Sequence, residues 1–473
     1  MKRVAAVLPG CGTVETMTST VAAPTVSPAP APALPPGPSL PKALQTAGFM
    51  FLGPRFLELC RRRYGGAVTF STLFDSRFVM IFDPTLVKQV FQGSAHGLHA
   101  GEANALLGPI LGQRSVLLLD GDEHLRHRRL LLPPFHGRNM RAYEEVILAS
   151  IDAEIDAWPV GEPFALLASM QALTLRVIVR AVFGYEPGPR EEELSRRLRA
   201  MIEPVAQPRG LLLMLTLGRL AGRDGAARSF ERRRARVDAL LYEEIKRRRA
   251  DPELSQRSDV FSALLLARDE DGRALTDQEV RDELVTLLLA GHETTATGLA
   301  WTFDLLLHHP RVLERALELD EAYLDAVVKE ALRLRPVIPG VGRVVRDQPF
   351  ALGSYTIPPG VELNPSIRMI HRRGDLYPTP EEFRPERFLA SDAPDTYTWL
   401  PFGGGTRRCL GASFALMEMR IVLARVLERS MLRSAETKLD EVQFRAITLA
   451  PRHGVRVVQA RFPEAPRHLT RGG

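Results

Sequence analysis

Apolar and polar positions recur with a helical period along most of the chain. Apolar side chains return every three or four residues in four long stretches, which predict amphipathic helices at residues 141–158, 163–184, 190–205 and 228–250. Strand-like patterns are short and predict β-strands at residues 67–73, 78–82, 344–345, 353–357 and 455–458. The pattern therefore predicts a mainly α fold with a small β part.

The clearest predicted helix runs from Thr276 to His309, just before Pro310. Thr276 is followed three residues later by Glu279, which matches a capping box at a helix start. About 33 residues at 1.5 Å each give a helix of roughly 50 Å, long enough to cross a whole domain. Because this helix is apolar nearly all round, we expect it to be buried.

The ends of the chain differ in composition from the middle. Residues 1–38 are rich in Ala, Pro, Thr and Ser, cannot bury enough apolar surface to order themselves, and are expected to be disordered. Residues 39–463 have a globular composition, and residues 464–473 are expected to form a flexible tail. The net charge of +6, from 62 basic and 56 acidic residues, favours an acidic partner only weakly.

The three cysteines are Cys11, Cys60 and Cys409. They are too few and too scattered for a disulfide framework, which favours a reducing compartment. No apolar run approaches the ~18 residues needed to span a bilayer, so we expect a cytoplasmic protein with no transmembrane segment. Cys60 fits a core position of a helix, and Cys11 falls in the N-terminal segment.

Two features that suggest nucleotide or nucleic-acid binding have simpler interpretations. The arginine-rich runs 232–234 and 246–249 are interleaved with acidic residues, which favours a solvated helix face over a nucleic-acid surface. The glycines at 403–405 do not follow a βαβ pattern, so they do not indicate a dinucleotide site.

The strongest chemical motif runs from Phe402 to Gly411 and reads Phe-Gly-Gly-Gly-Thr-Arg-Arg-Cys-Leu-Gly. Cys409 stands at the start of a predicted helix, where the helix dipole, Arg407 and Arg408 are expected to lower the pKa of its thiol. A thiolate suits a soft or redox-active metal. A glycine-rich turn beside an incidental cysteine explains the glycines alone, but the full spacing Phe-x-x-Gly-x-Arg-x-Cys-x-Gly is more specific.

A second motif lies in the long predicted helix, at Ala290-Gly291-His292-Glu293-Thr294. The small Ala290 and Gly291 leave room for a flat cofactor or oxygen beside the helix. Glu293 and Thr294 form an acid–alcohol pair, and a buried carboxylate is costly unless it has a function or a partner. Alternatively, the Thr294 hydroxyl bonds to a carbonyl one turn earlier. His292 is expected to be incidental.

Together these motifs resemble those of the cytochrome P450 family. The resemblance covers about residues 40–463 and implies a single helix-rich catalytic domain of triangular shape. It implies haem b between the long helix and the helix after the cysteine loop. Cys409 would be the axial thiolate ligand of the iron, with Gly411 and Phe402 beside it, and Arg407 would contact a haem propionate. Ala290 and Gly291 would line the cofactor, while Glu293 and Thr294 would help to deliver protons during oxygen activation.

Further residues gain meaning from the same resemblance. His124 and Arg128, four apart on one helix face, would contact a propionate. Arg343 would be a third propionate-binding residue, with Arg346 as a near competitor. A buried ionic network is also implied, and it would join Glu330, Arg333 and Arg387.

The implied reaction is a monooxygenation, in which one atom of dioxygen enters an apolar substrate. Because no flavin or nicotinamide domain is fused to the chain, electrons would come from a separate ferredoxin- or flavodoxin-type partner, docking near Arg408 and Arg420. A peroxygenase or isomerase on the same scaffold, or a non-catalytic haem-binding protein, is the alternative.

The substrate cavity can be sketched by family analogy alone. Its expected lining suits a lipid-like, terpenoid or steroid-like molecule and comprises residues 101–116, Leu287, Ala290, residues 337–341 and residues 447–449. The leucine-rich run 211–215 is expected to be ordinary helix packing rather than an entrance or a membrane contact.

Overall fold

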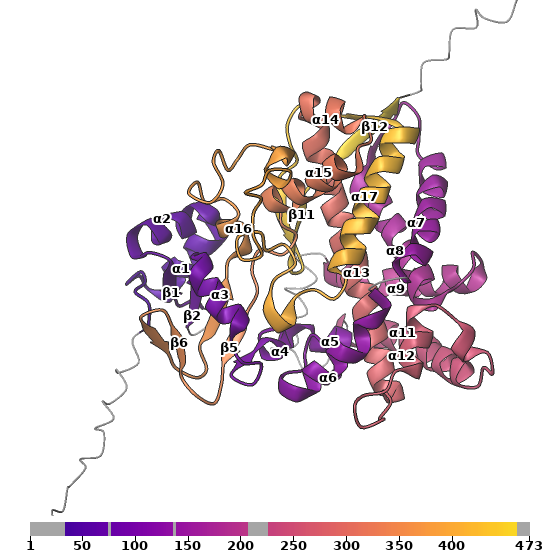
Figure 1. The fold of residues 1–473 in the computed structure, drawn as a ribbon, viewed down its shortest axis with the longest axis horizontal. Helices are drawn as coiled ribbons and strands as arrows, with labels where there is room; N and C mark the ends of the chain where they lie inside the picture. Colours follow the sequence, from indigo (N-terminus) through magenta and orange to yellow (C-terminus); the bar gives the residue numbers. More distant parts are fainter. Residues whose placement is uncertain (1–33, 74–76, 136–138, 207–225, 461–473) are drawn as a thin grey trace, which may run out of the picture.

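The computed structural model describes residues 34–73, 77–135, 139–206 and 226–460. Figure 1 shows a large helical part beside a smaller part that holds the N-terminal helices and strands. The helices are α1 (Lys42–Ala47), α2 (Pro54–Tyr64), α3 (Pro84–Gln92), α4 (Ala100–Ala103), α5 (Gly108–Leu111), α6 (Gly121–Leu131), α7 (Asn139–Asp156), α8 (Leu166–Phe183), α9 (Pro189–Ala206), α11 (Ala226–Arg249), α12 (Val260–Leu266), α13 (Asp277–Leu307), α14 (Pro310–Ala316), α15 (Glu321–Leu334), α16 (Ile367–Ile370) and α17 (Ala412–Arg429). The predicted fold class, mainly α with a small β part, is confirmed.

The strands are short, as predicted. They are β1 (Ala67–Phe70), β2 (Phe78–Ile81), β3 (Leu98–His99), β4 (Pro163–Ala165), β5 (Arg343–Val345), β6 (Phe350–Leu352), β7 (Tyr355–Ile357), β8 (Glu362–Pro365), β9 (Met431–Ser434), β10 (Val442–Arg445), β11 (Thr448–Pro451) and β12 (Arg456–Ala460). The largest described sheet has the order β1-β2-β8-β5-β3, and β10 and β11 form a separate hairpin. The sheet matters for function because β5 carries Arg343, in antiparallel register with Leu363 of β8.

The four predicted amphipathic helices correspond to α7, α8, α9 and α11. The one local error is at residues 163–165, which form β4 and pair with β12 rather than opening the helix. Within the described residues, α8 alone is long and apolar enough to cross a bilayer, and most of it is buried in the protein.

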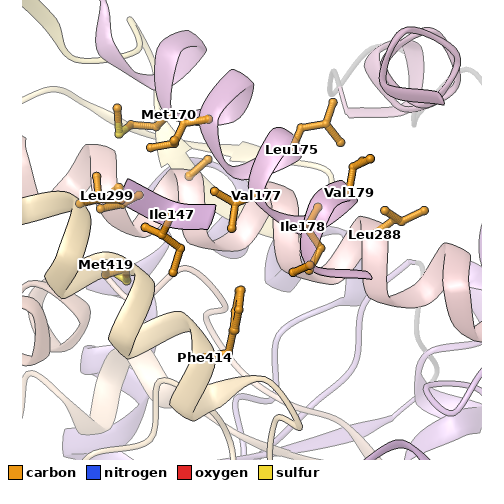
Figure 2. Packing of buried hydrophobic residues seen from close by; sticks show 14 of the residues in the cluster. Ile147, Met170, Leu175, Val177, Ile178, Val179, Leu288, Leu299, Phe414 and Met419 are labelled. Carbon is orange, nitrogen blue, oxygen red and sulfur yellow. The ribbon is translucent and has the colours of Figure 1, made fainter. Parts of the chain in front are cut away.

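The long helix α13 begins as its capping box predicts. The backbone N–H of Glu279 donates to Thr276 Oγ1 at 3.2 Å, and the Thr276 N–H donates to Glu279 Oε2 at 2.7 Å. Figure 2 shows α7, α8, α13 and α17 meeting through apolar side chains, including Ile147, Val177 and Leu299. Burial on several faces explains why the α13 sequence is apolar nearly all round.

The predicted ionic network is present at the start of the loop that leads toward Cys409. Glu330 and Arg333 of α15 are both fully buried, and Arg333 Nε lies 2.7 Å from Glu330 Oε2. Arg387 Nε lies 3.2 Å from the other oxygen of Glu330, which also accepts a hydrogen bond from the Arg384 N–H at 3.0 Å. The network therefore fastens the segment around residues 384–387 to α15.

One interpretation of the arginine-rich runs was wrong. Arg248 in α11 is not part of a solvated face, because its side chain is fully buried against Glu244, Asp259 and Ser262. Nearby Lys246, like most of that run, is exposed as expected. Sequence spacing missed this because Asp259 and Ser262 approach Arg248 from α12 and the turn before it.

The N-terminal boundary lies partly outside the described residues. Residues 34–38, within the segment expected to be disordered, are described, and the Pro36 carbonyl accepts a hydrogen bond from the Thr69 N–H of β1 at 3.2 Å. The leucine-rich run 211–215, Cys11 and the C-terminal tail 464–473 lie outside the described residues.

Candidate active site

Each of the three successive glycines of the cysteine loop, at 403–405, has a structural reason. Gly403 and Gly405 have positive φ values of 66° and 65°, a backbone conformation that side chains disfavour. At Gly404 a Cβ would lie 2.2 Å from the ring of Phe91. The loop then closes on itself, because the Cys409 N–H donates to the Phe402 carbonyl at 3.0 Å. This geometry fixes Cys409 just before α17.

The electrostatics of Cys409 differ from the sequence expectation. Part of the Cys409 side chain is accessible, but many protein atoms surround the sulfur. The resulting loss of solvation raises the pKa of the thiol. A hydrogen bond from the Gly411 backbone and the charges of Arg128 and Arg408 act in the opposite direction but do not outweigh it. The prediction of a lowered pKa was therefore wrong for the protein alone, because it counted the nearby charges and omitted desolvation.

Four basic side chains gather near Cys409 from three parts of the chain. His124 and Arg128 come from α6, Arg343 from β5 and Arg407 from the cysteine loop. His124 and Arg343 are buried, with 1% and 7% of their surfaces exposed. The four lie close enough to repel one another, since burial and the charges of Arg407, Arg128 and Arg343 lower the pKa of His124 to about 3.

This cluster has too few negative partners among the described residues. Arg407 pairs with Asp120 and donates to the Val116 carbonyl at 3.2 Å. Arg343 donates to the Gly342 carbonyl at 2.7 Å, and burial together with Arg407 lowers its pKa to about 10.

The deficit extends to the two α6 residues. His124 Nδ1 is buried without a hydrogen-bond partner in the described structure. Burial lowers the pKa of Arg128, and Arg408 lowers it further. Buried cations without counter-charges are costly, so the cluster fits a ligand that supplies carboxylates. Beside a cysteine at a helix start, that chemistry matches the two propionates and the iron of haem.

The two candidate arginines of the strand region have different environments. Arg346 forms an ion pair with Glu102, and its side chain is 41% exposed. Arg343 instead points into the basic cluster and lies 5.9 Å from the centre of the Phe91 ring. The structure thus brings Arg343, and not Arg346, together with His124 and Arg407.

The motif on α13 divides between two faces of the helix. Ala290 is exposed in an otherwise largely buried helix, and Leu287 and Thr294, on the same face, are partly exposed. Gly291 has a packing role, because a Cβ there would lie 3.0 Å from Ile178 Cδ1 in α8, and its expected place beside a cofactor stays a prediction. The small residue at 291 therefore permits close helix packing (Figure 2 shows Ile178 on α8 beside α13), while Ala290 leaves the open face.

Glu293 and Thr294 do not form a hydrogen-bonded pair in this structure. Thr294 Oγ1 donates to the Ala290 carbonyl at 2.6 Å, so the hydroxyl bonds to a carbonyl one turn earlier, as the alternative interpretation of the motif predicts. Glu293 Oε2 accepts a hydrogen bond from Gln171 Nε2 at 2.8 Å, and Glu293 Oε1 lies 2.8 Å from Arg445 Nε. Burial raises the pKa of Glu293, while Arg445 and Gln171 act to lower it.

Sequence reasoning missed Gln171, Arg445 and Asp120. Gln171 is 122 residues from Glu293, and Arg445 comes from the C-terminal hairpin. No spacing rule connects positions so far apart, so only the tertiary structure identifies these partners.

The segments expected to line a substrate cavity are joined to the same region. The Leu449 N–H donates to the Val337 carbonyl at 2.7 Å, which links two of the segments directly. The loop around Val116 is held to α13, since the Val116 N–H donates to Glu283 Oε1 at 2.9 Å. The Val116 carbonyl in turn accepts from Arg407, so this loop connects α13 with the cysteine loop.

Comparison with known proteins agrees with the geometry. Residues 32–454 match the family described as Cytochrome P450. The chain is 41% identical over 434 residues to cytochrome P450 135B1 of Mycobacterium tuberculosis, covering 90% of this chain and 91% of that protein. It is 38% identical over 437 residues to cytochrome P450 137 of the same organism, covering 89% and 90%.

Solved structures show the same likeness. A cyanobacterial CYP120A1 with bound retinoic acid superposes with a TM-score of 0.77 at 25% identity, covering 91% of this chain and 99% of that one. The haem domain of cytochrome P450DA superposes with a TM-score of 0.76 at 25% identity, covering 91% and 98%.

Proposed function

The chain belongs to the cytochrome P450 family and is a haem monooxygenase, and from that premise we propose its specific chemistry. In this proposal the cofactor is haem b, and the reaction is hydroxylation or epoxidation of an apolar organic substrate. The observation that carries the assignment is the buried basic cluster, short of counter-charges, beside Cys409.

The basic cluster and the cysteine loop contain the residues that would hold the cofactor. Cys409 would supply the thiolate ligand, while His124, Arg128, Arg343 and Arg407 would bind the propionates. Positive charge from the iron would favour the thiolate and reverse the raised pKa that burial gives the free thiol. Haem, when bound, supplies the activation of dioxygen, and the protein contributes position, charge and protons.

The residues of α13 suit the handling of protons. Thr294 Oγ1 lies on the partly open face of the helix, where its hydroxyl can rotate from the Ala290 carbonyl toward the site. The carboxyl group of Glu293 lies one residue away, and burial raises its pKa, which favours a carboxyl that can take up and release a proton. Because the Glu293 carboxylate is tied to Gln171 and Arg445, passing a proton to Thr294 requires a side-chain rotation or an intervening water.

The substrate is proposed to be an apolar, lipid-like, terpenoid or steroid-like molecule. Support comes from the partly open apolar face at Leu287 and Ala290 and from the linked segments around Val116, Val337 and Leu449. Retinoic acid is bound in the structurally similar cyanobacterial CYP120A1, which is consistent with this class.

The electron donor is proposed to be a separate ferredoxin- or flavodoxin-type protein in the cytoplasm. Arg408 is exposed at the cysteine loop and suits an acidic partner. Arg420 suits it less well, because its guanidinium lies 2.8 Å from Glu321 Oε1. If charge reversal at Arg408 left electron-transfer rates and their salt dependence unchanged, this docking face would be rejected.

The deciding experiment is the spectrum of the reduced protein with carbon monoxide, compared with that of a Cys409→Ser variant. A strongly red-shifted Soret band that is lost in the variant supports thiolate ligation through Cys409. An unshifted band in folded wild-type protein would contradict it. Turnover with peroxide but not with a reductase would favour the peroxygenase alternative, and failure to couple electron flow to product with any substrate would favour a haem carrier.

A further inference from the structure

Exposed apolar side chains are concentrated at the N-terminal end of the fold. Of the seventeen large apolar side chains exposed in the described residues, seven fall within residues 40–73. They are Leu40, Leu44, Met50, Phe51, Leu52, Leu59 and Leu73. Figure 1 shows α1, α2 and β1 gathered at one extremity of the molecule, on the side away from α7, α9 and α11. We call these seven residues the N-terminal apolar patch.

The patch projects from a firmly packed support. In the helical turn Gly48–Leu52, Met50 is 69% exposed and Phe51 is 83% exposed. The adjacent Phe49 instead turns inward, where its ring centre lies 5.0 Å from that of Phe70. An aromatic core thus fixes this turn while its tip faces solvent.

Hydrogen bonds hold the rest of the patch near this turn. The Leu73 N–H donates to Thr46 Oγ1 at 3.1 Å, and the Leu40 carbonyl accepts from Gln45 Nε2 at 2.8 Å. Both contacts reach α1, which runs directly into the turn, so Leu40, Leu44 and Leu73 lie along the same end of the fold.

Positive charge surrounds the patch. Residues 40–64 carry five basic residues and one acidic residue, a net charge of +4, against +6 for the whole chain. On α2, Arg55, Leu59 and Arg63 follow one another at four-residue spacing and therefore share a face. Within this segment Glu58 is the single acidic residue, and it is engaged with Arg61 and Arg62, while Asp375 from outside the segment acts on Arg61.

We propose that this end of the protein docks on a membrane surface containing anionic lipids. Apolar side chains at a tip with cations at its sides are the combination that binds a bilayer interface, with the apolar groups among the acyl chains and the cations at the headgroups. A second copy of the chain fits less well, since residues 40–64 of each copy carry a net charge of +4 and would repel each other. The same charge disfavours a basic protein partner.

The test is flotation of the full-length, haem-loaded protein with phosphatidylcholine vesicles, with and without phosphatidylglycerol. We expect binding that requires phosphatidylglycerol and weakens as salt is added. Replacing Met50 and Phe51 by Ser should lower the partition coefficient about tenfold or more, since both side chains would be buried in the interface. The double change Arg55→Glu with Arg63→Glu should abolish the preference for phosphatidylglycerol.

Matched controls come from α14 and the residue that follows it, since α14 lies away from the patch in Figure 1. Leu317 is 53% exposed and Arg311 is exposed, so Leu317→Ser and Arg311→Glu change surface apolarity and charge elsewhere. These variants should float like wild type, and all variants should keep the wild-type Soret and circular dichroism spectra. Wild-type protein that fails to float, or equal flotation of the Met50/Phe51 variant, would overturn the proposal. If wild-type protein forms a dimer and binds no vesicles, and the Met50/Phe51 variant is monomeric, then a second copy of the chain is the occupant of the patch.

Discussion

Arg445 Nε lies 2.8 Å from Glu293 Oε1, so the C-terminal hairpin supplies a positive charge to the carboxylate of Glu293 on α13. The two atoms form an ion pair by distance, although their angle is not that of a hydrogen bond. Gln171 from α8 donates to the other oxygen of Glu293 at 2.8 Å. The protonation of Glu293 therefore depends on two elements outside α13.

We expect Arg445→Gln to raise the pKa of Glu293, because burial already raises it and Arg445 is the main opposing influence. The native state would then hold this proton more tightly than the unfolded chain, so unfolding free energy would fall as pH rises through the shifted interval. Infrared difference spectra, titrated with pH, would follow the protonated carboxyl band that is absent in Glu293→Gln.

The matched control is Arg452→Gln, which removes an exposed ion pair with Glu441. It should leave the carboxyl titration unchanged. If the band titrates at the same pH with and without Arg445, then the ion pair does not set the protonation of Glu293.

Thr294→Ala should lower the product formed per electron consumed, while Thr294→Ser should retain most of it. The hydroxyl now bonds to the Ala290 carbonyl at 2.6 Å, and positioned proton donors contribute roughly 10²–10⁴-fold to such steps. Stability should change by only about 1 kcal/mol for the lost hydrogen bond. The readout is the ratio of product to reductant, and equal coupling in the Ala and Ser variants would show that the hydroxyl is dispensable.

Arg343→Leu should act in opposite directions on the haem-free and haem-loaded protein. Without haem, removing a buried cation relieves repulsion within the cluster, so thermal stability should be maintained or raised and the pKa of His124 should rise. With haem, a charge-assisted partner is lost, so haem should dissociate about tenfold or more faster. Arg346→Leu, at the surface pair with Glu102, should leave the haem dissociation rate unchanged. Equal haem loss in the two variants would remove Arg343 from the binding site.

Glu330→Gln should destabilise the protein by about 3–5 kcal/mol, because it leaves the buried charges of Arg333 and Arg387 uncompensated. Urea unfolding monitored by circular dichroism would measure the loss. Glu386→Gln breaks a half-exposed pair with Arg315 and should cost no more than about 1 kcal/mol. Similar losses of unfolding free energy in both variants would mean that the buried network stabilises the protein no more than the surface ion pair does.

The pair between His127 and Glu283 should make stability depend on pH. Glu283 Oε1 lies 2.7 Å from His127 Nδ1, and burial raises the pKa of Glu283 from 4.5 to about 7. Burial opposes protonation of His127, but its hydrogen bonds to Glu283 and Glu279 outweigh this and raise its pKa above 6.5.

Both groups hold protons more tightly in the folded state, so unfolding free energy should fall as pH rises from about 4.5 upward. Glu283→Gln should flatten the curve of denaturation midpoint against pH, whereas Glu270→Gln, at a surface site 81% exposed, should not. A curve as steep in Glu283→Gln as in wild type would assign the pH dependence to other groups.

The sequence by itself determined most of the local structure. The helical period placed α7, α9, α11, α13 and α17, and the capping box fixed the start of α13 at Thr276. The motif spacing also identified the Cys409 loop. These features depend on residues that are close in sequence, or on motifs whose spacing reflects hydrogen bonding within one turn or helix. Arg387, 57 residues from Glu330, was expected only from the family resemblance.

Tertiary structure decided the environment of each of these groups. It assigned Gly291 to packing against Ile178, tied Glu293 to Arg445, and separated the buried Arg343 from the paired Arg346. It also reversed the expected direction of the Cys409 pKa. The reason is physical: desolvation and charge pairing depend on atoms that come together from distant parts of the chain, and no local pattern of residues encodes those distances.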